Sequence, residues 1–370
     1  MKRNFMENLL DGVEVEWVPL NKVVKTVTAP TKVKKEIYRE KGKIPIIDQG
    51  ITFIAGYTDE DLEPVNEDDY IVFGDHSEHI KYVDFAFIQG ADGLKILKSK
   101  FANTKYVYYA FVNFYQKELN YKRHWSSAKE ILIPIPCPEN PEKSLEIQEE
   151  IVRILDAFTE LTAELTAELT ARKKQYNYYR EQLLTFEEGQ VEWKTLGEVC
   201  SIGVGQSPND TGIGEYPFVN AGTTPSGYLS DFNTEPDTIT TPSRGQGGIG
   251  FVGYQNSHFW CGPLCYRIRS TCKSIKTRFI YYVMSNSMAN IIGLANMAGV
   301  PALNRKELIL FKIPIPCLTE QERIVSILDK FETLTTSITE GLPREIELRQ
   351  KQYEYYRNML LSFPKEEVEK

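Results

Sequence analysis

The second half of this chain repeats its first half at an offset of about 175 residues. Both halves contain the sequence Ile-Pro-Ile-Pro-Cys, at residues 133–137 and 313–317, and a long amphipathic stretch follows each copy. A period of this length is well above the roughly 20–50 residues of solenoid repeats. We therefore interpret the chain as a duplicated domain with a duplicated connector. Whatever one half binds, the other half is expected to bind at a second site a set distance away.

The two connectors have the sequence pattern of long helices. Apolar and aromatic residues recur every three or four positions over 145–186, and neither Pro nor Gly interrupts them. The second connector begins with a capping-box sequence at residues 319–322. Its Gly-Leu-Pro at 341–343 predicts a break or kink, with Pro343 at the first position of a restarted helix. Polar positions also correspond, Gln148 with Gln321 and Asp156 with Asp329.

Because both helices carry matching apolar stripes and each follows a globular region, we expect them to pair as an antiparallel coiled coil. The alternative is that each helix packs on its own domain.

The first connector contains a short tandem array. The sequence Thr-Ala-Glu-Leu occurs at Thr162–Leu165 and again at Thr166–Leu169. Four residues make about 1.1 helical turns and about 6 Å of rise, so one copy more or less rotates the apolar stripe by only about 40°. This pattern predicts a spacer of adjustable length, marked by Thr162, Leu165, Thr166 and Leu169. The alternative is a low-complexity helical stretch without that role.

Both globular halves have the pattern of short strands, turns rich in Gly, Pro, Asn and Asp, and a little helix. Strands are expected at 43–50, 69–75, 82–90, 216–222, 249–254 and 265–270, and helices at 104–115 and 277–286. The predicted fold class is α+β: two similar mixed α/β domains separated by a long antiparallel helical coiled coil, with a pseudo-twofold internal repeat. The expected boundaries are 1–143 for the first domain, 144–187 for its connector, 188–317 for the second domain and 318–370 for the second connector, interrupted near 341–343.

Composition and charge set few limits on function. The net charge of −8 comes mainly from the connectors, since the globular halves 1–144 and 189–316 carry only −2 and +2. Nearly neutral domains with local basic clusters permit nucleic-acid binding without an overall basic footprint. The sequence has no 18-residue apolar run, so no membrane association is expected. Six irregularly spaced cysteines and a start without an apolar signal region favour a cytoplasmic protein with reduced thiols.

Several motifs that suggest chemistry lack the context that the chemistry requires. A G-x-G-x-x-G sequence at 245–250 precedes a strand-like segment where a dinucleotide site needs a helix, so we interpret its glycines as a turn. The sequence from His258 to Cys272 lacks a C-x-x-C knuckle, which favours buried thiols over a zinc site. Residues 75–79, Asp-His-Ser-Glu-His, have no counterpart in the second half and are interpreted as a solvated polar loop. We predict no catalytic residue and no metal ligand.

Binding is the remaining function. Basic, amide and hydroxyl side chains with aromatic and glycine neighbours are the types that contact phosphates and base edges. They occur in loops that differ between the halves, which predicts two readers of different ligands on a shared frame. The alternative for each of them is a solvated surface charge. The candidate DNA-binding residues are Lys32, Lys34, Lys35, His76, Lys122, Arg123, His124, Trp125, Thr223, Thr224, Arg244 and Gln246.

The order of a globular domain, Ile-Pro-Ile-Pro-Cys and a long helix, occurring twice, resembles the specificity subunits of type I DNA restriction–modification systems. The Thr-Ala-Glu-Leu array and the sequences RKKQYNYYR and GLPREIELRQKQYEYYR are most similar to the type IC branch. The resemblance covers the helical regions closely and the globular halves only in their frame. It implies two target-recognition domains, each reading one part of a bipartite target on double-stranded DNA. The paired helices would set the spacer between those parts.

The resemblance also implies partners and cofactors. Two modification (methyltransferase) subunits, which bind S-adenosylmethionine and methylate adenine, are expected to dock on this chain. Restriction (endonuclease and translocase) subunits that use ATP and Mg are expected to join them. The chain itself is expected to be non-catalytic and to hold no cofactor. The residues alone leave two other functions open: a coiled-coil scaffold whose globular ends bind proteins, and an enzyme with a site at residues 75–79.

Overall fold

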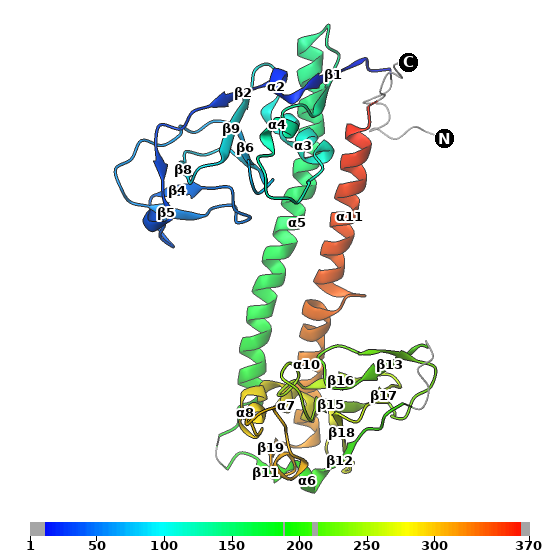
Figure 1. The fold of residues 1–370 in the computed structure, drawn as a ribbon. Helices are drawn as coiled ribbons and strands as arrows, with labels where there is room; N and C mark the ends of the chain where they lie inside the picture. The colour runs from blue at the N-terminus through cyan, green and yellow to red at the C-terminus, as the bar shows by residue number, and fades with distance from the viewer. Residues whose placement is uncertain (1–11, 188, 209–213, 364–370) are drawn as a thin grey trace. The chain divides into compact units, whose positions relative to one another are not determined.

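A computed structural model describes residues 12–187, 189–208 and 214–363, and the chain folds into two compact units (Figure 1). The first unit combines the chain up to Glu164 with the chain from Ile346 onward, and the second runs from Leu165 to Glu345. Each unit therefore contains one globular domain and parts of both connectors. No helix among the described residues is long and apolar enough to cross a membrane.

The first domain is a mixed α/β fold with three sheets. A four-stranded antiparallel sheet has the order β2-β9-β6-β7, a second sheet has the order β3-β8-β4-β5, and β1 pairs with β10. In the second sheet β8 is parallel to β3 and β4, whereas β4 and β5 are antiparallel. The elements are β1 (Val15–Pro19), α2 (Leu20–Val23), β2 (Val24–Val27), β3 (Lys32–Val33), η1 (Lys35–Ile37), β4 (Ile44–Ile47), β5 (Gly56–Thr58), β6 (Tyr70–Gly74), β7 (Ile80–Val83), β8 (Ile88–Gly90), β9 (Leu94–Ser99), α3 (Thr104–Phe114), α4 (Trp125–Ala128) and β10 (Leu132–Pro136).

The second domain repeats this topology, except that its second sheet has three strands and, among the described residues, no counterpart of β3. Its sheets have the orders β12-β18-β15-β16, β14-β13-β17 and β11-β19, and β13 is parallel to β17 as β4 is to β8. The matching strand order and direction confirm the internal repeat that the sequence predicts. The elements are β11 (Glu192–Thr195), α6 (Leu196–Val199), β12 (Cys200–Val204), β13 (Tyr216–Val219), β14 (Gly227–Leu229), β15 (Thr238–Pro242), β16 (Gly253–Gln255), β17 (Trp260–Cys261), β18 (Cys265–Ser270), α7 (Thr277–Asn286), α8 (Met288–Gly293), α9 (Arg305–Leu308) and β19 (Lys312–Ile315).

Two of the expected strands differ from the structure. The segment 82–90 is two strands, β7 and β8, because the chain leaves one sheet after Val83 and enters the other at Ile88. The segment 249–254 contributes only the first residues of β16, because Gly250 has a positive φ of 88° and the turn continues through it. The other expected strands and both helices are present, and their ends differ from the expected ones by at most three residues.

A single helix covers the main sheet of each domain. α3 buries Tyr106, Val107, Ala110 and Phe111, which lie on one face at helical spacing. The Asn103 side chain caps its start by accepting a hydrogen bond from the Tyr106 N–H at 3.0 Å. α7 buries the corresponding residues of the second domain, Phe279, Ile280, Val283 and Met284.

The first connector is one helix, α5 (Pro141–Leu184), of 44 residues. It starts before the expected residue 144 because Asn140 Oδ1 accepts a hydrogen bond from the Lys143 N–H at 3.2 Å, and Pro141 occupies the first turn. The second connector is broken as expected, into α10 (Leu318–Thr336) and α11 (Gly341–Leu361), although Pro343 is the third residue of α11.

The capping box predicted at 319–322 is wrong. α10 begins at Leu318, with Cys317 at the N-cap position and no side-chain cap. The Gln321 side chain is fully buried and serves a different contact. Gln321 Oε1 accepts a hydrogen bond from the Lys276 N–H at 3.0 Å, just before α7. Its counterpart Gln148 accepts from the Asn103 N–H at 2.9 Å, just before α3. Each buried glutamine thus joins the start of a connector to the start of the domain helix.

A carboxylate about two turns later makes the second repeated contact. Asp156 Oδ2 accepts from Lys105 Nζ at 2.7 Å, and Asp156 Oδ1 accepts from the Tyr109 hydroxyl at 2.6 Å. Burial, and then this hydrogen bond, raise the pKa of Tyr109, which keeps the phenol protonated as a donor. Because Lys105 and Tyr109 are one helical turn apart on α3, they grip the same carboxylate.

The same clasp holds the second domain. Asp329 Oδ1 accepts from Arg278 Nε at 2.7 Å and from the Tyr282 hydroxyl at 2.5 Å. Glu332 extends it by accepting from the Tyr281 hydroxyl at 2.6 Å. We refer to the contacts of Asp156 and of Asp329 as the first and second aspartate clasps.

The far end of each connector packs on the other domain. In the first unit, Arg357 of α11 donates to Asn113 Oδ1 of α3 at 3.1 Å. In the second unit, Arg180 of α5 donates to Asn286 Oδ1 of α7 at 3.2 Å.

Aromatic rings repeat beside these contacts. Phe158 stacks on Tyr356 with ring centroids 5.1 Å apart, and Phe331 stacks on Tyr179 at 5.7 Å. Each unit therefore pairs the first part of one connector with the last part of the other. This arrangement replaces the alternative in which a connector packs only on its own domain.

We predict that Asp156→Ala loosens α3 in the first unit. The clasp side chains Asp156 and Lys105 are only 24% and 28% exposed, so losing this charged hydrogen bond should cost about 2 kcal/mol. Hydrogen exchange should become faster in α3 and remain unchanged in α7. Glu160→Ala, at an exposed position one turn later on α5, is the matched control. Equal exchange in α3 of both variants would contradict the clasp.

Candidate nucleic-acid interface

Four loops of the first domain meet at one end of its sheets. They follow β4, β6 and β8 and connect α3 to α4. The loop after β6 joins the other three: His76 N–H donates to Gln49 Oε1 at 3.3 Å, Asp75 N–H donates to Gly93 O at 2.7 Å, and Asp75 O accepts from His124 N–H at 2.8 Å. The His76 ring also stacks on Tyr121, with centroids 5.5 Å apart and planes 18° apart. These contacts define the first loop cluster.

Large apolar and basic side chains project from this cluster. Tyr121, Leu119 and Ile51 are 92%, 85% and 82% exposed. Lys122 and Arg123 follow Tyr121 and are also exposed, with Lys122 paired to Glu118. Exposed aromatic rings beside cations and amides suit a ligand that offers flat rings and negative charge.

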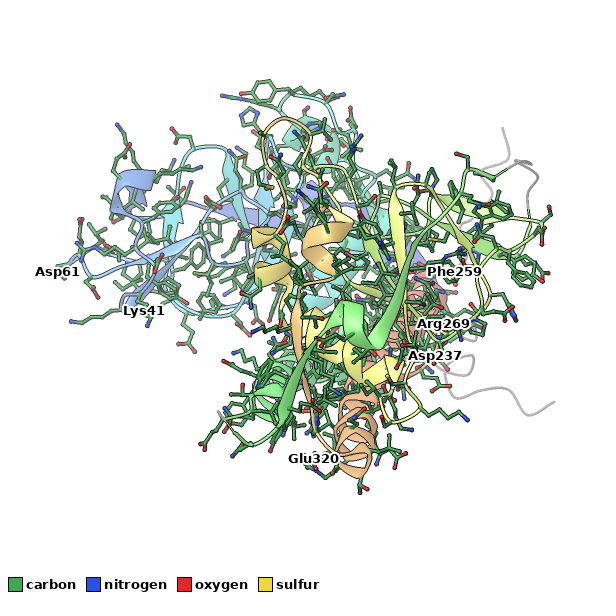
Figure 2. The ribbon with its side chains drawn as sticks, turned by 90° about the horizontal axis from the view of Figure 1, so that it is seen from below. Lys41, Asp61, Asp237, Phe259, Arg269 and Glu320 are labelled. Atoms are coloured by element: carbon green, nitrogen blue, oxygen red, sulfur yellow. The ribbon has the colours of Figure 1, made fainter. Side chains whose placement is uncertain are left out.

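The predicted site residues of the first domain fall into three groups. His76, Lys122 and Arg123 lie in the loop cluster, and Lys32 lies beside it because its Nζ is 3.8 Å from Asp92. Lys34 and Lys35 are exposed near the start of η1. The segment 32–43 is rich in Lys and Arg, and Figure 2 shows its Lys41 at the outer rim of the domain.

His124 and Trp125 serve the fold. His124 is fully buried, with Nε2 2.9 Å from Asn120 O and Nδ1 3.3 Å from Glu78. A buried imidazole cannot touch a ligand, so we remove His124 from the candidate set. Trp125 is half-buried, packs on Phe73 with centroids 6.0 Å apart, and donates its backbone N–H to Asp75 Oδ1 at 2.8 Å.

The equivalent loops of the second domain also meet. They follow β13, β15 and β17 and connect α8 to α9. Ser243 accepts from Leu303 N–H at 2.9 Å and donates its own N–H to Leu264 O at 2.8 Å. Asn220 Oδ1 accepts from Leu264 N–H at 2.9 Å. These contacts define the second loop cluster.

Glycine makes this cluster possible. A Cβ at Gly248 would lie 1.9 Å from Ala221 O, so only glycine lets the loop after β15 approach the loop after β13. The adjacent Gly245 has a φ of 119° and donates its N–H to Pro301 O at 3.0 Å. The glycines at 245–250 therefore shape a turn, and a strand follows them where a dinucleotide fold would place a helix.

The predicted residues of the second domain come together in these loops. Thr223 and Thr224 are exposed after β13, and Arg244 and Gln246 are exposed after β15. Arg244 also forms a backbone bridge with Ala302 of the α8–α9 loop.

Sequence reasoning missed three polar contributors to the clusters: Gln49, Tyr121 and Asn220. A usable signal was present for the loop itself, because Pro45–Gly50 aligns with Pro217–Gly222 and places a polar residue, Asp48 or Asn220, two positions before a glycine after the same strand. No comparable signal marked Tyr121.

The side chains that suggested other chemistry have structural contacts. Cys261 and Cys265 are buried, with Cys261 Sγ 3.5 Å from Cys265 O, while His258 Nε2 is 2.9 Å from Glu235. Within the described ranges, no group of three His, Cys, Asp or Glu side chains is arranged to hold a metal ion. The segment 75–79 is not the solvated loop expected from the sequence, because Asp75 and Glu78 are buried and both accept hydrogen bonds from backbone N–H groups.

Comparison with known proteins assigns the family. The family model described as the type I restriction modification DNA specificity domain matches twice, at residues 12–172 and 189–348. The chain belongs to the type I restriction–modification specificity subunits.

Relatives of this specificity-subunit family match over nearly the whole chain. The type I restriction enzyme EcoR124I/EcoR124II specificity subunit of Escherichia coli is 44% identical, covering 99% of this chain and 98% of the relative. A putative type I restriction enzyme specificity subunit of Haemophilus influenzae is 35% identical, covering 98% and 99%. The crystal structure of a type I S subunit from M. genitalium has the same fold, with a TM-score of 0.71 at 19% identity over 99% of this chain and 98% of that one.

In this specificity subunit, a buried carboxylate orders the loop that carries Tyr121. Glu78 accepts from the Tyr115 hydroxyl and the Glu118 N–H, both at 2.7 Å, and from the Leu119 N–H at 2.9 Å. Burial alone would raise the pKa of Glu78, but these donors and the nearby His124 outweigh burial and lower it.

We therefore predict that acid loosens the loop at 117–121. A carboxyl whose folded pKa is lowered contributes stability above its unfolded pKa of about 4.3 and loses it as pH falls through the lower folded value. Glu78→Gln should produce the same loosening at pH 7, by about 2 kcal/mol, measured as faster hydrogen exchange at 117–121. Glu67→Gln, at an exposed position, is the control. Unchanged exchange both in Glu78→Gln and below pH 4 would refute this role.

Proposed function

We propose that this chain is the sequence-reading subunit of a type I restriction–modification complex, and that each domain reads one part of a bipartite DNA target. One observation carries the proposal: the same four loops meet at the same end of two equivalent domains, but with different side chains. A shared frame with different loops suits two readers that each recognise their own short sequence.

The two clusters offer different chemistry to DNA. In the first, the exposed Tyr121 ring and the cations Lys122 and Arg123 suit contacts with bases and phosphates. In the second, Arg244 projects from a glycine turn, a position from which a guanidinium can bind a guanine edge, and the Gln246 amide suits adenine. Thr223 and Thr224 complete this cluster. Lys32, Lys34 and Lys35 would add phosphate contacts in the first domain.

We further propose that the Thr-Ala-Glu-Leu array sets the number of base pairs between the two parts of the target. α5 passes through the array without a break, and its backbone is continued there by ordinary helical hydrogen bonds. Leu161, Leu165 and Leu169 are half-buried along one stripe, whereas Ala163, Glu164 and Glu168 are exposed. Adding a four-residue copy keeps this stripe nearly in register.

The partner roles follow from family membership and are part of the proposal. Two modification subunits would bind S-adenosylmethionine and methylate adenine, and restriction subunits would use ATP and Mg to cleave. The chain would supply no catalytic residue or cofactor site and would act in the cytoplasm, where these partners and DNA meet.

We predict that inserting one Thr-Ala-Glu-Leu after Leu169 lengthens the target spacer by one base pair. The insertion adds about 6 Å of helix, and B-DNA rises about 3.4 Å per base pair. The inserted copy rotates the apolar stripe of α5 by about 40°, and one added base pair twists the DNA by roughly 35°. Because these two rotations are comparable, we expect one added base pair rather than two. Methylation-sensitive sequencing of host DNA measures the spacer, and deleting Thr166–Leu169 should shorten it equally.

Thr170→Ala is the control for this experiment. It removes the Thr170 hydroxyl hydrogen bond to Thr166 O at 2.9 Å without changing helix length, so the spacer should stay the same. Both base-reading sequences should also persist in the insertion variant, because neither loop cluster is altered. An insertion variant that methylates only the original spacing would show that the array is a passive helix.

A further inference from the structure

The second domain contains an arginine-lined pocket that is separate from its loop cluster. The pocket has a volume of about 520 Å³ and lies beside β12 and β18. Its charged lining residues are Arg267, Arg269, Arg305 and Glu235. We propose that this pocket binds a backbone phosphate of the DNA, an inference that rests on the proposed function.

Strand geometry turns two of the arginines toward the pocket. Tyr266 and Ile268 alternate with Arg267 and Arg269 along β18, and both are buried in the main core. Because successive side chains of a strand point to opposite faces, Arg267 and Arg269 lie together on the other face of the sheet. Arg269 is labelled in Figure 2.

Hydrogen bonds fix two of the guanidinium groups and leave their charge unpaired. Arg267 Nη1 donates to Asn233 O at 3.1 Å and to Thr234 Oγ1 at 3.3 Å, and Arg305 Nε donates to Ile202 O at 3.0 Å. The nearby Glu235 is instead 2.9 Å from His258 Nε2. Within the described part of the chain, none of the three arginines forms an ion pair. The pocket therefore has a net positive charge and two guanidinium groups held in place by hydrogen bonds, which suits an oxyanion.

A glycine keeps the pocket open. Gly203 of β12 lies directly opposite Arg267 in the sheet. A Cβ at Gly203 would lie 3.1 Å from Arg267 Nε, so a larger residue would crowd the guanidinium.

The first domain has different side chains at the equivalent strands. Aligning β9 with β18 places Ile96 at the position of Arg267 and Lys98 at that of Arg269. Ile96 is buried in an apolar cluster opposite Val27 rather than a glycine. Lys98 is neutralised by an ion pair with Asp68. The repeat therefore provides an internal comparison, in which the same two strand positions hold a buried isoleucine and a paired lysine.

Tyr266 connects the strand that lines the pocket to the second loop cluster. The Tyr266 hydroxyl donates to Leu303 O at 2.9 Å, and Leu303 is bonded to Ser243 beside Arg244. Burial raises the pKa of Tyr266, and Arg305 and Arg244 both oppose that rise. Because the pocket and the loop cluster are joined through β18 within one domain, we assign the pocket to the backbone of a bound duplex rather than to a separate small anion.

The test uses Arg269→Ala, because the Arg269 side chain has no hydrogen-bond or ion-pair partner among the described residues and its removal should spare the fold. The full-length chain, in the complex isolated from its host, is titrated with pooled duplex DNA at several salt concentrations. Losing one phosphate contact should reduce the slope of log affinity against log salt by about 0.9. Affinity should fall alike for all sequences, and the methylated sequence should not change.

Two further variants serve as controls. Arg269→Lys keeps the charge and should retain most of the wild-type slope. Lys98→Ala, at the equivalent position of the first domain, should leave the slope unchanged because Lys98 is already paired with Asp68.

The remaining outcomes separate the alternatives. An unchanged slope in Arg269→Ala, while the wild-type complex binds DNA, overturns the pocket assignment and leaves the proposed function standing. A change of the methylated sequence means that Arg269 reads bases, which also overturns it. If Arg269→Ala abolishes thermal stabilisation by inorganic pyrophosphate but leaves the DNA slope unchanged, the pocket takes free anions instead. A wild-type complex that binds no DNA defeats both proposals.

Discussion

The contact on which each domain depends is a connector carboxylate held by two residues of the domain helix. Asp156 binds Lys105 and Tyr109, and Asp329 binds Arg278 and Tyr282. Because donors one turn apart grip one acceptor, the domain helix can neither rotate nor slide along the connector without losing both bonds. The buried amides of Gln148 and Gln321 add a second fixed point at the start of each domain helix. Two such points orient the sheets, and therefore the loop clusters, on the connector.

The far end of each connector contacts the domain of the other half of the sequence. Arg180 of the first connector binds Asn286 of the second domain, and Arg357 of the second connector binds Asn113 of the first. Each unit is therefore built from both halves of the sequence. This exchange explains why the connectors are more alike in sequence than the loops. Each connector contacts its own domain near its start and the other domain near its end, whereas each loop contributes to its own cluster.

Much of this architecture is predictable from sequence because it rests on repetition and periodicity. The duplicated frame, α5, α7 and the break before Gly341 all follow from spacing alone. The misses have local causes. The capping box predicted at 319–322 is wrong because α10 begins at Leu318, one residue before the box, and the buried Gln321 amide bonds to the Lys276 N–H and to Pro316 O. His124 looked like a surface base because Lys122 and Arg123 precede it, yet the fold turns it inward toward Glu78. Tyr121 and the arginine pocket depend on which loops and strand faces meet, and that is a tertiary property.

The central claim is that the two domains read their parts of the target independently, and a domain exchange tests it most directly. Residues 22–131 are replaced by the corresponding segment of a relative that keeps the Lys and Tyr of the first aspartate clasp. Methylation-sensitive sequencing then identifies the modified DNA sequence before and after the exchange. Independent readout predicts that one part of the target changes while the spacer and the other part persist. If both parts changed together, or if neither did, the loop clusters would not be separate readers.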